Sequence, residues 1–119
     1  MKLMVCGSRT ITDSTWVFEQ IDKLVQEQNF DLSTLTLVDG GAKGVDTFAA
    51  HWANEKNVQI EWHRPDWARR GRGAGIVRNK EMVEACDFCL ILWDGVSKGT
   101  KNDIDLCYKL GKRNKVVLR

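Results

Sequence analysis

The sequence predicts an α/β fold: a doubly wound, mainly parallel five-stranded sheet with helices on both faces. Short apolar runs of strand-forming residues alternate along the chain with segments of helical spacing. Strands joined by helix-length connections are expected to be parallel, because the crossover returns the chain to the same end of the sheet. The run 88–93 is apolar throughout, which is typical of a central strand covered on both faces.

The expected elements follow one another in regular order. Five apolar runs bounded by glycine or charge are expected as strands, at 3–6, 35–38, 58–62, 88–93 and 116–118. Four helices are expected between the strands, the third at roughly 75–86. In each of the other three, helical spacing places one set of residues on a common face: Val17, Ile21, Leu24 and Val25 in the first; Val45, Ala49, Trp52 and Ala53 in the second; and Ile104, Cys107, Tyr108 and Gly111 in the fourth. This order predicts a Rossmann-like topology.

Length and composition predict one domain. A chain of 119 residues, 43% of them hydrophobic, is long enough to bury one sizeable core and too short for two independent domains, so residues 1–119 are expected to form a single domain. No run approaches the ~18 to 20 apolar residues of a membrane helix. Neither export nor a membrane partner is therefore expected.

The four cysteines lie in expected strands or helices among apolar neighbours, which favours reduced core thiols and a cytoplasmic location. Cys86 and Cys89 have C-x-x-C spacing, but a zinc site needs further ligands and the chain has only His51 and His63. Core packing is preferred over a metal or redox pair, and no metal is expected.

Positive charge is concentrated in one segment. The whole chain carries +2, whereas the segment 63–80 contains six basic residues and one aspartate. The modest total charge disfavours a general polyanion-binding protein. Within the segment, Trp67 is suited to stacking on a base, and Arg78 and Asn79 lie near the start of a helix, from which Arg78 would reach back toward the strand ends. Arg69 and Arg70 are expected to be exposed and to bind nothing.

Glycine-rich loops follow three of the expected strands. In an open parallel sheet the ligand crevice lies outside the carboxyl ends of the strands, and amide groups at the start of the next helix attract anions. Tight turns alone would explain any one loop, but three converging loops favour a phosphate site. The loop residues expected to bind the ligand are Gly7, Ser8, Arg9, Gly40, Gly41, Ala42, Lys43, Gly44, Asp46, Gly95, Ser97, Gly99 and Thr100.

Some of these residues have structural alternatives. Thr100 and Asp103 have the spacing of a capping box, so a helix-capping role competes with a role in chemistry. Asp46 either stabilises a helix N-terminus or accepts hydrogen bonds from a ribose. Neither G-x-G-x-x-G nor G-x-x-x-x-G-K-[ST] occurs, which disfavours a dinucleotide dehydrogenase and a Walker-type ATPase. No cofactor is expected.

Several blocks in order along the chain are similar to one known family. They are Gly7-Ser8-Arg9, the run 39–46, Asp66-Trp67, the run 74–82 and the run 94–100. With these blocks the chain resembles the SLOG superfamily, the Rossmann-like group that includes the LOG phosphoribohydrolases and the DNA-processing protein DprA, and within it the YspA-like branch. The resemblance implies a site for a nucleotide derivative at the glycine-rich strand ends.

The resemblance also implies candidate catalytic residues. LOG enzymes cleave the N-glycosidic bond of nucleoside monophosphates with an arginine and a glutamate in a P-G-G-x-G-T-x-x-E type loop. Arg78 is similar in position to that arginine. The glutamate is absent here, and Asp103 is the nearby carboxylate.

The sequence is compatible with three functions. The first is binding of a nucleotide or nucleotide-derived small molecule, as a sensor or sequestering module. The second is phosphoribohydrolase-like cleavage with Arg78 and Asp103 as catalytic residues. The third, disfavoured by the net charge, is single-stranded nucleic-acid binding through the arginine segment. Five tryptophans make a homo-oligomer, most simply a dimer, plausible.

Overall fold

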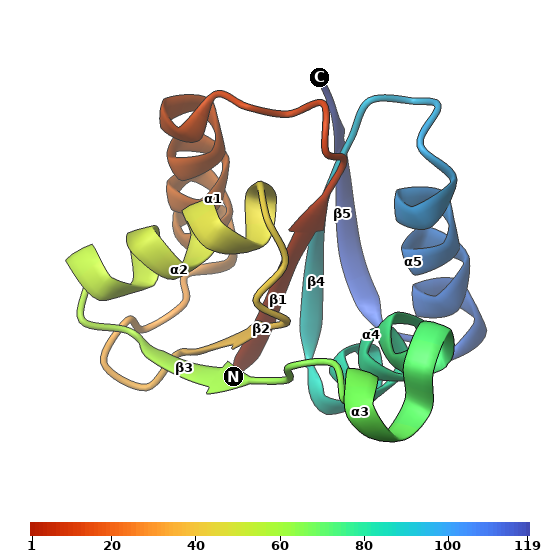
Figure 1. Ribbon diagram of the computed structural model, residues 1–119. Coiled ribbons are helices and arrows are strands. Elements are labelled where there is room, and N and C mark those ends of the chain that lie inside the picture. Colours follow the sequence, from red (N-terminus) through yellow and green to blue (C-terminus); the bar gives the residue numbers. More distant parts are fainter.

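A computed structural model describes residues 1–119 as one five-stranded sheet with helices on both faces (Figure 1). The strand order is β3-β2-β1-β4-β5, and every neighbouring pair is parallel. The strands are β1 (Lys2–Gly7), β2 (Thr36–Asp39), β3 (Gln59–Trp62), β4 (Phe88–Trp93) and β5 (Arg113–Leu118). The predicted α/β fold class is confirmed.

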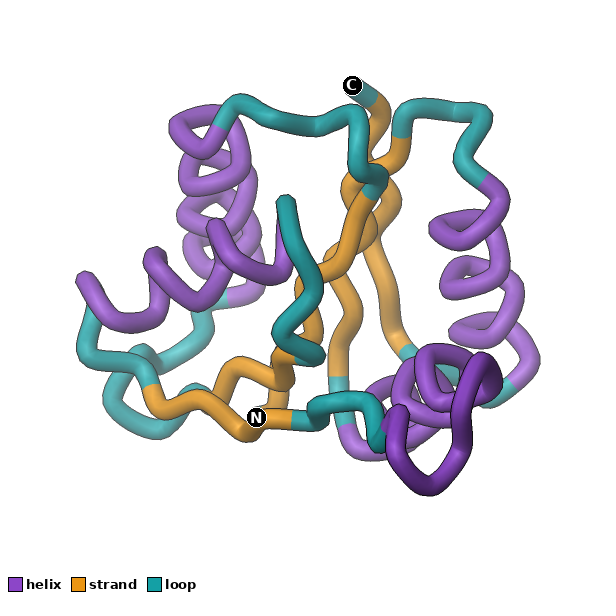
Figure 2. Tube along the Cα trace, in the orientation of Figure 1, coloured by secondary structure: helices purple, strands orange, loops and turns teal.

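The helices divide between the two faces of the sheet. They are α1 (Ser14–Gln28), α2 (Val45–Glu55), α3 (Trp67–Arg70), the 3₁₀ helix η1 (Gly71–Gly73), α4 (Ala74–Ala85) and α5 (Lys98–Lys109). In Figures 1 and 2, α1 and α2 lie on one side of the sheet, and α4 and α5 lie on the other. None of the helices combines the length and apolar character needed to cross a bilayer.

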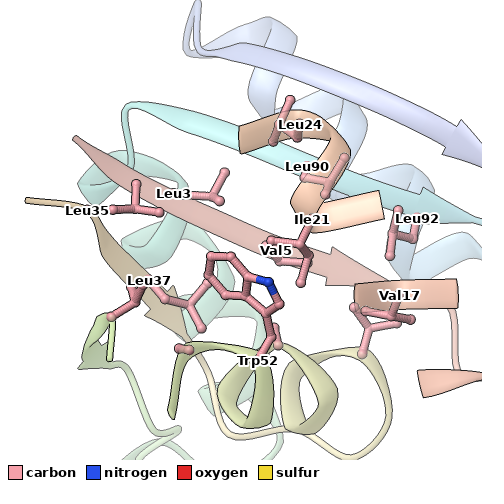
Figure 3. Close-up of a cluster of buried hydrophobic side chains, with 14 of the residues drawn as sticks. Leu3, Val5, Val17, Ile21, Leu24, Leu35, Leu37, Trp52, Leu90 and Leu92 are labelled. Carbon is pink, nitrogen blue, oxygen red and sulfur yellow. The ribbon is translucent and has the colours of Figure 1, made fainter. Parts of the chain in front are cut away.

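The alternation of side chains along β1 divides the core into two clusters. Leu3 and Val5 pack toward α1 and α2 in the larger cluster, where Trp52 is fully buried (Figure 3). The Trp52 indole N–H donates to Asp22 Oδ1 at 2.8 Å, so its one polar group is satisfied. Met4 and Cys6 point to the other face and pack toward α4 and α5.

The second cluster contains all four cysteines, each buried and free. Cys86 directly follows α4 and Cys89 lies in β4. Despite their C-x-x-C spacing, the two thiols are free and form no disulfide. Nor does any group of three or more His, Cys, Asp or Glu side chains lie where it would hold a metal ion. Both side chains pack in the second cluster.

Two segments differ from the sequence-based expectation. β5 begins at Arg113, before the apolar residues that were expected to start it, because it is an edge strand with partly exposed polar positions. The part of the basic segment before α4, for which no strand or helix was expected, contains α3 and η1. Asp66 initiates α3, since its side chain accepts from the backbone N–H of Arg69 at 3.1 Å.

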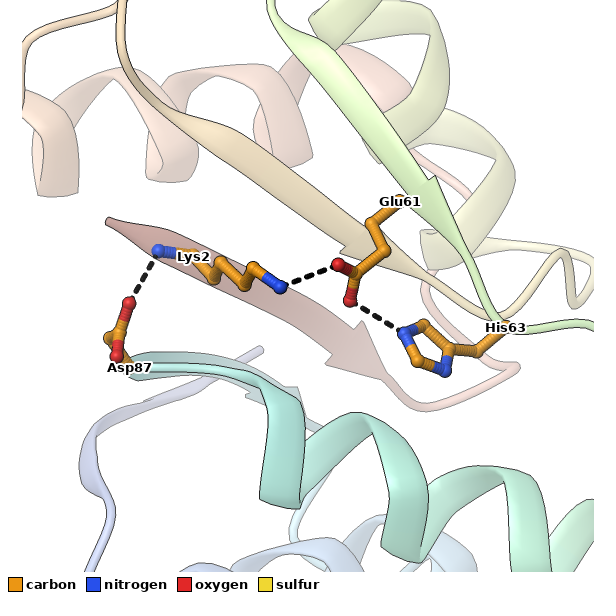
Figure 4. A network of polar contacts seen from close by, with 4 residues as sticks. All are labelled: Lys2, Glu61, His63 and Asp87. Carbon is orange, nitrogen blue, oxygen red and sulfur yellow. Dashed lines mark hydrogen bonds and ion pairs between the residues drawn. The ribbon is translucent and has the colours of Figure 1, made fainter.

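A polar network connects β1 with β3 across the intervening strand β2 (Figure 4). Lys2 Nζ lies 2.6 Å from Glu61 Oε1, and His63 Nε2 lies 2.7 Å from Glu61 Oε2. The Lys2 backbone N–H donates to Asp87 Oδ2 at 2.8 Å. These side chains are exposed or partly exposed, so solvent screens the ion pairs and makes their contribution to stability small.

Candidate functional site

The site lies at the switch point of the sheet, between the neighbouring strands β1 and β4, where the winding of the chain reverses. β1 and β4 are paired, but α1 follows β1 onto one face and α5 follows β4 onto the other (Figure 1). The loops after the two strands therefore separate and leave a crevice at the carboxyl edge of the sheet. Ser8 connects the two loops: its N–H donates to Leu92 O at 2.9 Å, and its Oγ accepts from the Asp94 N–H at 3.1 Å.

A pocket of about 390 Å³ occupies this crevice, and we name it the switch-point pocket. The three glycine-rich loops and α4 all contribute to it, so the expected convergence of three loops is present. Its lining consists of Met4, Cys6, Gly7, Ser8, Arg9, Ala42, Lys43, Asp46, Arg78, Asn79, Met82, Ser97, Gly99, Thr100 and Asp103.

A second pocket of about 870 Å³ adjoins the first, and we name it the arginine pocket. Arg9, Ala42, Lys43 and Arg78 line both pockets and form their common wall. The remaining lining residues of the arginine pocket are Gly40, Gly41, Gly44, Arg64, Pro65, Trp67 and Gly75.

The structure distributes the expected ligand-binding residues over these two pockets. Gly40, Gly41, Gly44 and Trp67 line only the arginine pocket, and the others line the switch-point pocket, with one exception. Gly95 lines neither pocket: its φ of 85° makes a left-handed turn beside Leu118. Gly95 thus belongs to the turn after β4.

Two helices reach the switch-point pocket with their first turns, α2 through Asp46 and α5 through Gly99 and Thr100. The N-cap residues are Gly44 for α2 and Ser97 for α5, and neither provides a capping side chain. In the turn before α5, the Asp94 carboxylate accepts from the N–H groups of Val96 and Ser97 and from the Ser97 hydroxyl. These hydrogen bonds, that of the Ser97 hydroxyl foremost, hold the pKa of Asp94 well below its ordinary value.

The capping-box interpretation of Thr100 and Asp103 is wrong. Because α5 begins at Lys98, both residues lie inside the helix, where they are buried and line the pocket. Thr100 Oγ1 lies 3.2 Å from Ser8 Oγ, across the gap between the two separating loops. Asp103 is therefore a buried carboxyl at the pocket and has no capping role.

Arg78 lies at the boundary between the two pockets, as expected from its place in the helix. Its Nη1 donates to Gly40 O at 2.8 Å and its Nε donates to Asn79 Oδ1 at 2.7 Å. No carboxylate lies within 4.0 Å of its guanidinium group. The Arg78 position is thus fixed by neutral acceptors, which leaves its charge uncompensated by a direct ion pair.

Asp46 and Asp103 bring carboxyl groups to the same pocket. Burial raises the pKa of both, that of Asp103 to about 6. Asp46 Oδ2 accepts from the Ala42 N–H at 3.2 Å, so Asp46 also orders the loop after β2. Asp103 titrates close to neutral pH, which is a property found in acid–base groups and also in buried structural carboxyls.

Asp39 was not among the expected site residues. It is fully buried at the end of β2; its Oδ1 accepts from the Gly41 N–H at 2.8 Å, while its Oδ2 has no partner. Burial and then repulsion by Asp46 raise the pKa of Asp39 to about 7. Its position immediately after a buried strand was the available signal. Arg64 was also missed, because only the fold brings it over the Gly41 loop.

Several other basic side chains, and one histidine, lie outside both pockets. Arg69, Arg70 and Arg72 are exposed on α3 and η1 and line neither pocket. His51 is exposed on α2, also away from both pockets. The arginine segment thus divides, because Arg64 and Arg78 face a cavity while the residues between them face solvent.

Comparison with known proteins identifies the family. The family model described as "YspA, cpYpsA-related SLOG family" matches residues 1–70. The Gene 61 protein of Mycobacterium phage D29 is 38% identical over 116 residues, which cover 92% of this chain and 90% of the phage protein. No solved structure gives a significant match.

These matches define a protein of the SLOG superfamily, as the motifs predicted. Within that superfamily, the chain belongs to the YspA, cpYpsA-related family.

A methyl group at position 40 is expected to disturb Arg78. The Cβ of Gly40→Ala would lie 2.7 Å from Arg78 Nη1 and 2.9 Å from Met82 sulfur, so we expect a loss of roughly 1–3 kcal/mol in urea unfolding. Gly73→Ala is the matched control, since its Cβ would meet nothing within 4 Å and its φ of −77° suits alanine. Equal stability of the two variants would contradict this packing.

Neutralising Asp39 is expected to change how stability depends on pH. The pKa of Asp39 rises from 3.8 to about 7 in the fold, so the unfolded carboxyl ionises first and stability is lost between about pH 4 and pH 7. Asp39→Asn removes this loss. The free energy of unfolding of the variant relative to wild type should therefore rise by roughly 1–4 kcal/mol from pH 4 to pH 8.

Urea unfolding at several pH values measures this difference. Asp105→Asn is the control, because Asp105 is an exposed partner of Lys101 on α5. A constant difference between Asp39→Asn and wild type across the pH range would show that Asp39 is not buried as described.

Proposed function

We propose that the chain binds a nucleotide or nucleotide-derived small molecule in the switch-point pocket, as a sensor or sequestering module. One observation carries the proposal: the same pocket combines uncapped helix N-termini and three basic side chains with two buried carboxyl groups. A phosphorylated sugar presents the complementary pair, an anionic phosphate beside hydroxyl donors. Membership of the SLOG superfamily supports a ligand of this class.

The phosphate is expected at the side of the pocket formed by the start of α5. Ser97, Gly99 and Thr100 bring the first turn of this helix to the pocket, and their position gives a phosphate access to backbone N–H groups and to the positive end of the helix dipole. Arg78 adds a planar set of donors suited to phosphate oxygens. Arg9 and Lys43 add positive charge at the mouth.

The sugar hydroxyls are expected at Asp46 and Asp103. A carboxylate is an acceptor only, so it suits the hydroxyl donors of a ribose, and its burial excludes competing water. The two groups lie on α2 and α5, which approach the pocket from opposite faces of the sheet. A ligand bound to both would therefore span the gap between the two halves of the fold.

Binding is expected to depend on Arg78. We expect Arg78→Ala to weaken the binding of a nucleoside monophosphate by about 10- to 100-fold, because a charge-assisted contact is lost. Calorimetric titration measures the affinity. Monophosphates of the four common ribonucleosides serve as probes. Arg70→Ala is the matched control, since it removes the same charge from an exposed position outside both pockets.

Two outcomes would count against the proposal. One is that no ribonucleotide binds the wild type, and the other is that both variants bind equally well. Because Arg78 supports the Gly40 carbonyl, thermal unfolding of Arg78→Ala and of the milder Arg78→Lys separates loss of binding from loss of fold.

A second candidate function, hydrolysis of the N-glycosidic bond, is favoured by Asp103. Its carboxyl is buried, lines the pocket, and has a pKa raised to about 6, so both the protonated and the ionised form are populated near neutral pH. Glycoside cleavage uses carboxyl groups to stabilise an oxocarbenium-like centre and to transfer a proton. Asp46 supplies a second carboxyl in the same pocket.

The hydrolytic candidate is tested by product release. Under this second hypothesis, wild type releases free base from a ribonucleoside monophosphate, Asp103→Asn releases none even at saturating nucleotide, and the exposed Asp105→Asn behaves as wild type. Chromatography of the reaction mixture measures the base. Binding without release in the wild type would eliminate hydrolysis and leave the binding function.

A further inference from the structure

The arginine pocket differs in charge from the pocket beside it. Its ionisable lining groups are Arg9, Lys43, Arg64 and Arg78, with no carboxylate among them, whereas Asp46 and Asp103 line the switch-point pocket. None of the four basic groups forms an ion pair within 4.0 Å. An anion in the arginine pocket would therefore meet several positive charges without displacing a protein carboxylate.

Arg64 is held in position over this pocket. Its guanidinium carbon lies 4.6 Å from the centre of the Trp62 ring, an arrangement of the cation–π type. The loop after β2 also comes close to Arg64, since a Cβ at Gly41 would lie 3.1 Å from Arg64 Nη1. Gly41 also has a φ of 73°, which glycine adopts without strain.

The two pockets are neighbours that share four lining residues: Arg9, Ala42, Lys43 and Arg78. Because Arg78 lines both, a phosphate bound to it in the switch-point pocket would have the arginine pocket beside it. A monophosphate would leave Arg64 without an anionic partner. A second phosphate would be placed among Arg64, Arg9 and Lys43.

We infer that the ligand of this site is a nucleotide carrying at least two linked phosphates, with the second phosphate in the arginine pocket against Arg64. This inference rests on the proposed function and names the class of nucleotide. It also separates Arg64 from the other arginines of its segment, since Arg69, Arg70 and Arg72 face solvent.

The test compares mono- and diphosphates of the same nucleoside. Wild type, Arg64→Ala and Arg70→Ala are titrated calorimetrically with both forms of adenosine, guanosine, cytidine and uridine nucleotides. An ionic strength near 0.15 M limits long-range effects, because the screening length is then about 8 Å. We expect wild type to prefer the diphosphate by about tenfold or more, from the added charge-assisted contacts.

Arg64→Ala should abolish most of that preference, because it weakens binding of the diphosphate far more than binding of the monophosphate, and Arg70→Ala should retain the preference. Arg64→Lys should restore part of the preference, since it keeps the charge and loses the planar donor set. The Arg64 side chain is exposed and forms no ion pair or hydrogen bond within the protein, so these variants are expected to fold.

Each result decides between the proposals. Equal affinity of wild type for mono- and diphosphates overturns the inference. The proposed function still stands in that case if monophosphate binding depends on Arg78. An equal loss of preference in Arg64→Ala and Arg70→Ala also overturns the inference, because the effect would then be general charge. If no nucleotide binds, both the inference and the proposed function fail.

Discussion

β1 and β4 are hydrogen-bonded neighbours, yet the helices that follow them pack on opposite faces of the sheet. This divergence opens the crevice in which the switch-point pocket lies. Because the loops after the two strands separate, side-chain hydrogen bonds are needed to connect them. Ser8 makes that connection through Leu92, Asp94 and Thr100. Ser8 is buried between the two loops and lines the pocket, so its hydrogen bonds hold the pocket wall together beyond the ends of β1 and β4.

The carboxyl edge of the sheet concentrates charges that an apolar core would not tolerate. Asp39, Asp46 and Asp103 are all buried there, and burial raises the pKa of each. Arg78 lies among them and lowers all three pKa values through its charge, without a direct ion pair. A phosphate bound at Arg78 would reduce this effect. Ligand binding and proton binding by these carboxyl groups are therefore expected to favour each other.

Much of the fold was available from local patterns. Short apolar runs predicted the strands, period-3.6 spacing predicted the main helices, and the uniformly apolar run of β4 predicted an interior strand buried on both faces. The polar start of β5 carried no such signal, because an edge strand is buried less than a central one. The capping-box interpretation of Thr100 and Asp103 failed for a related reason. The spacing fits a helix start, but the hydrogen bond from the Lys101 N–H to Ser97 O shows that the helix begins one turn earlier.

Local patterns in the chain were enough to predict the class of fold, the family, and the set of loops that meet at one edge of the sheet, because apolar periodicity and glycine position are local properties. Which side chains share a cavity depends instead on how distant segments pack in the folded chain. Arg64 and Arg78 face the pockets while the arginines between them face solvent, and Asp39 is buried with one oxygen unpaired. These distinctions depend on how α4 and the loop after β2 pack together, and no local pattern of residues contains that information.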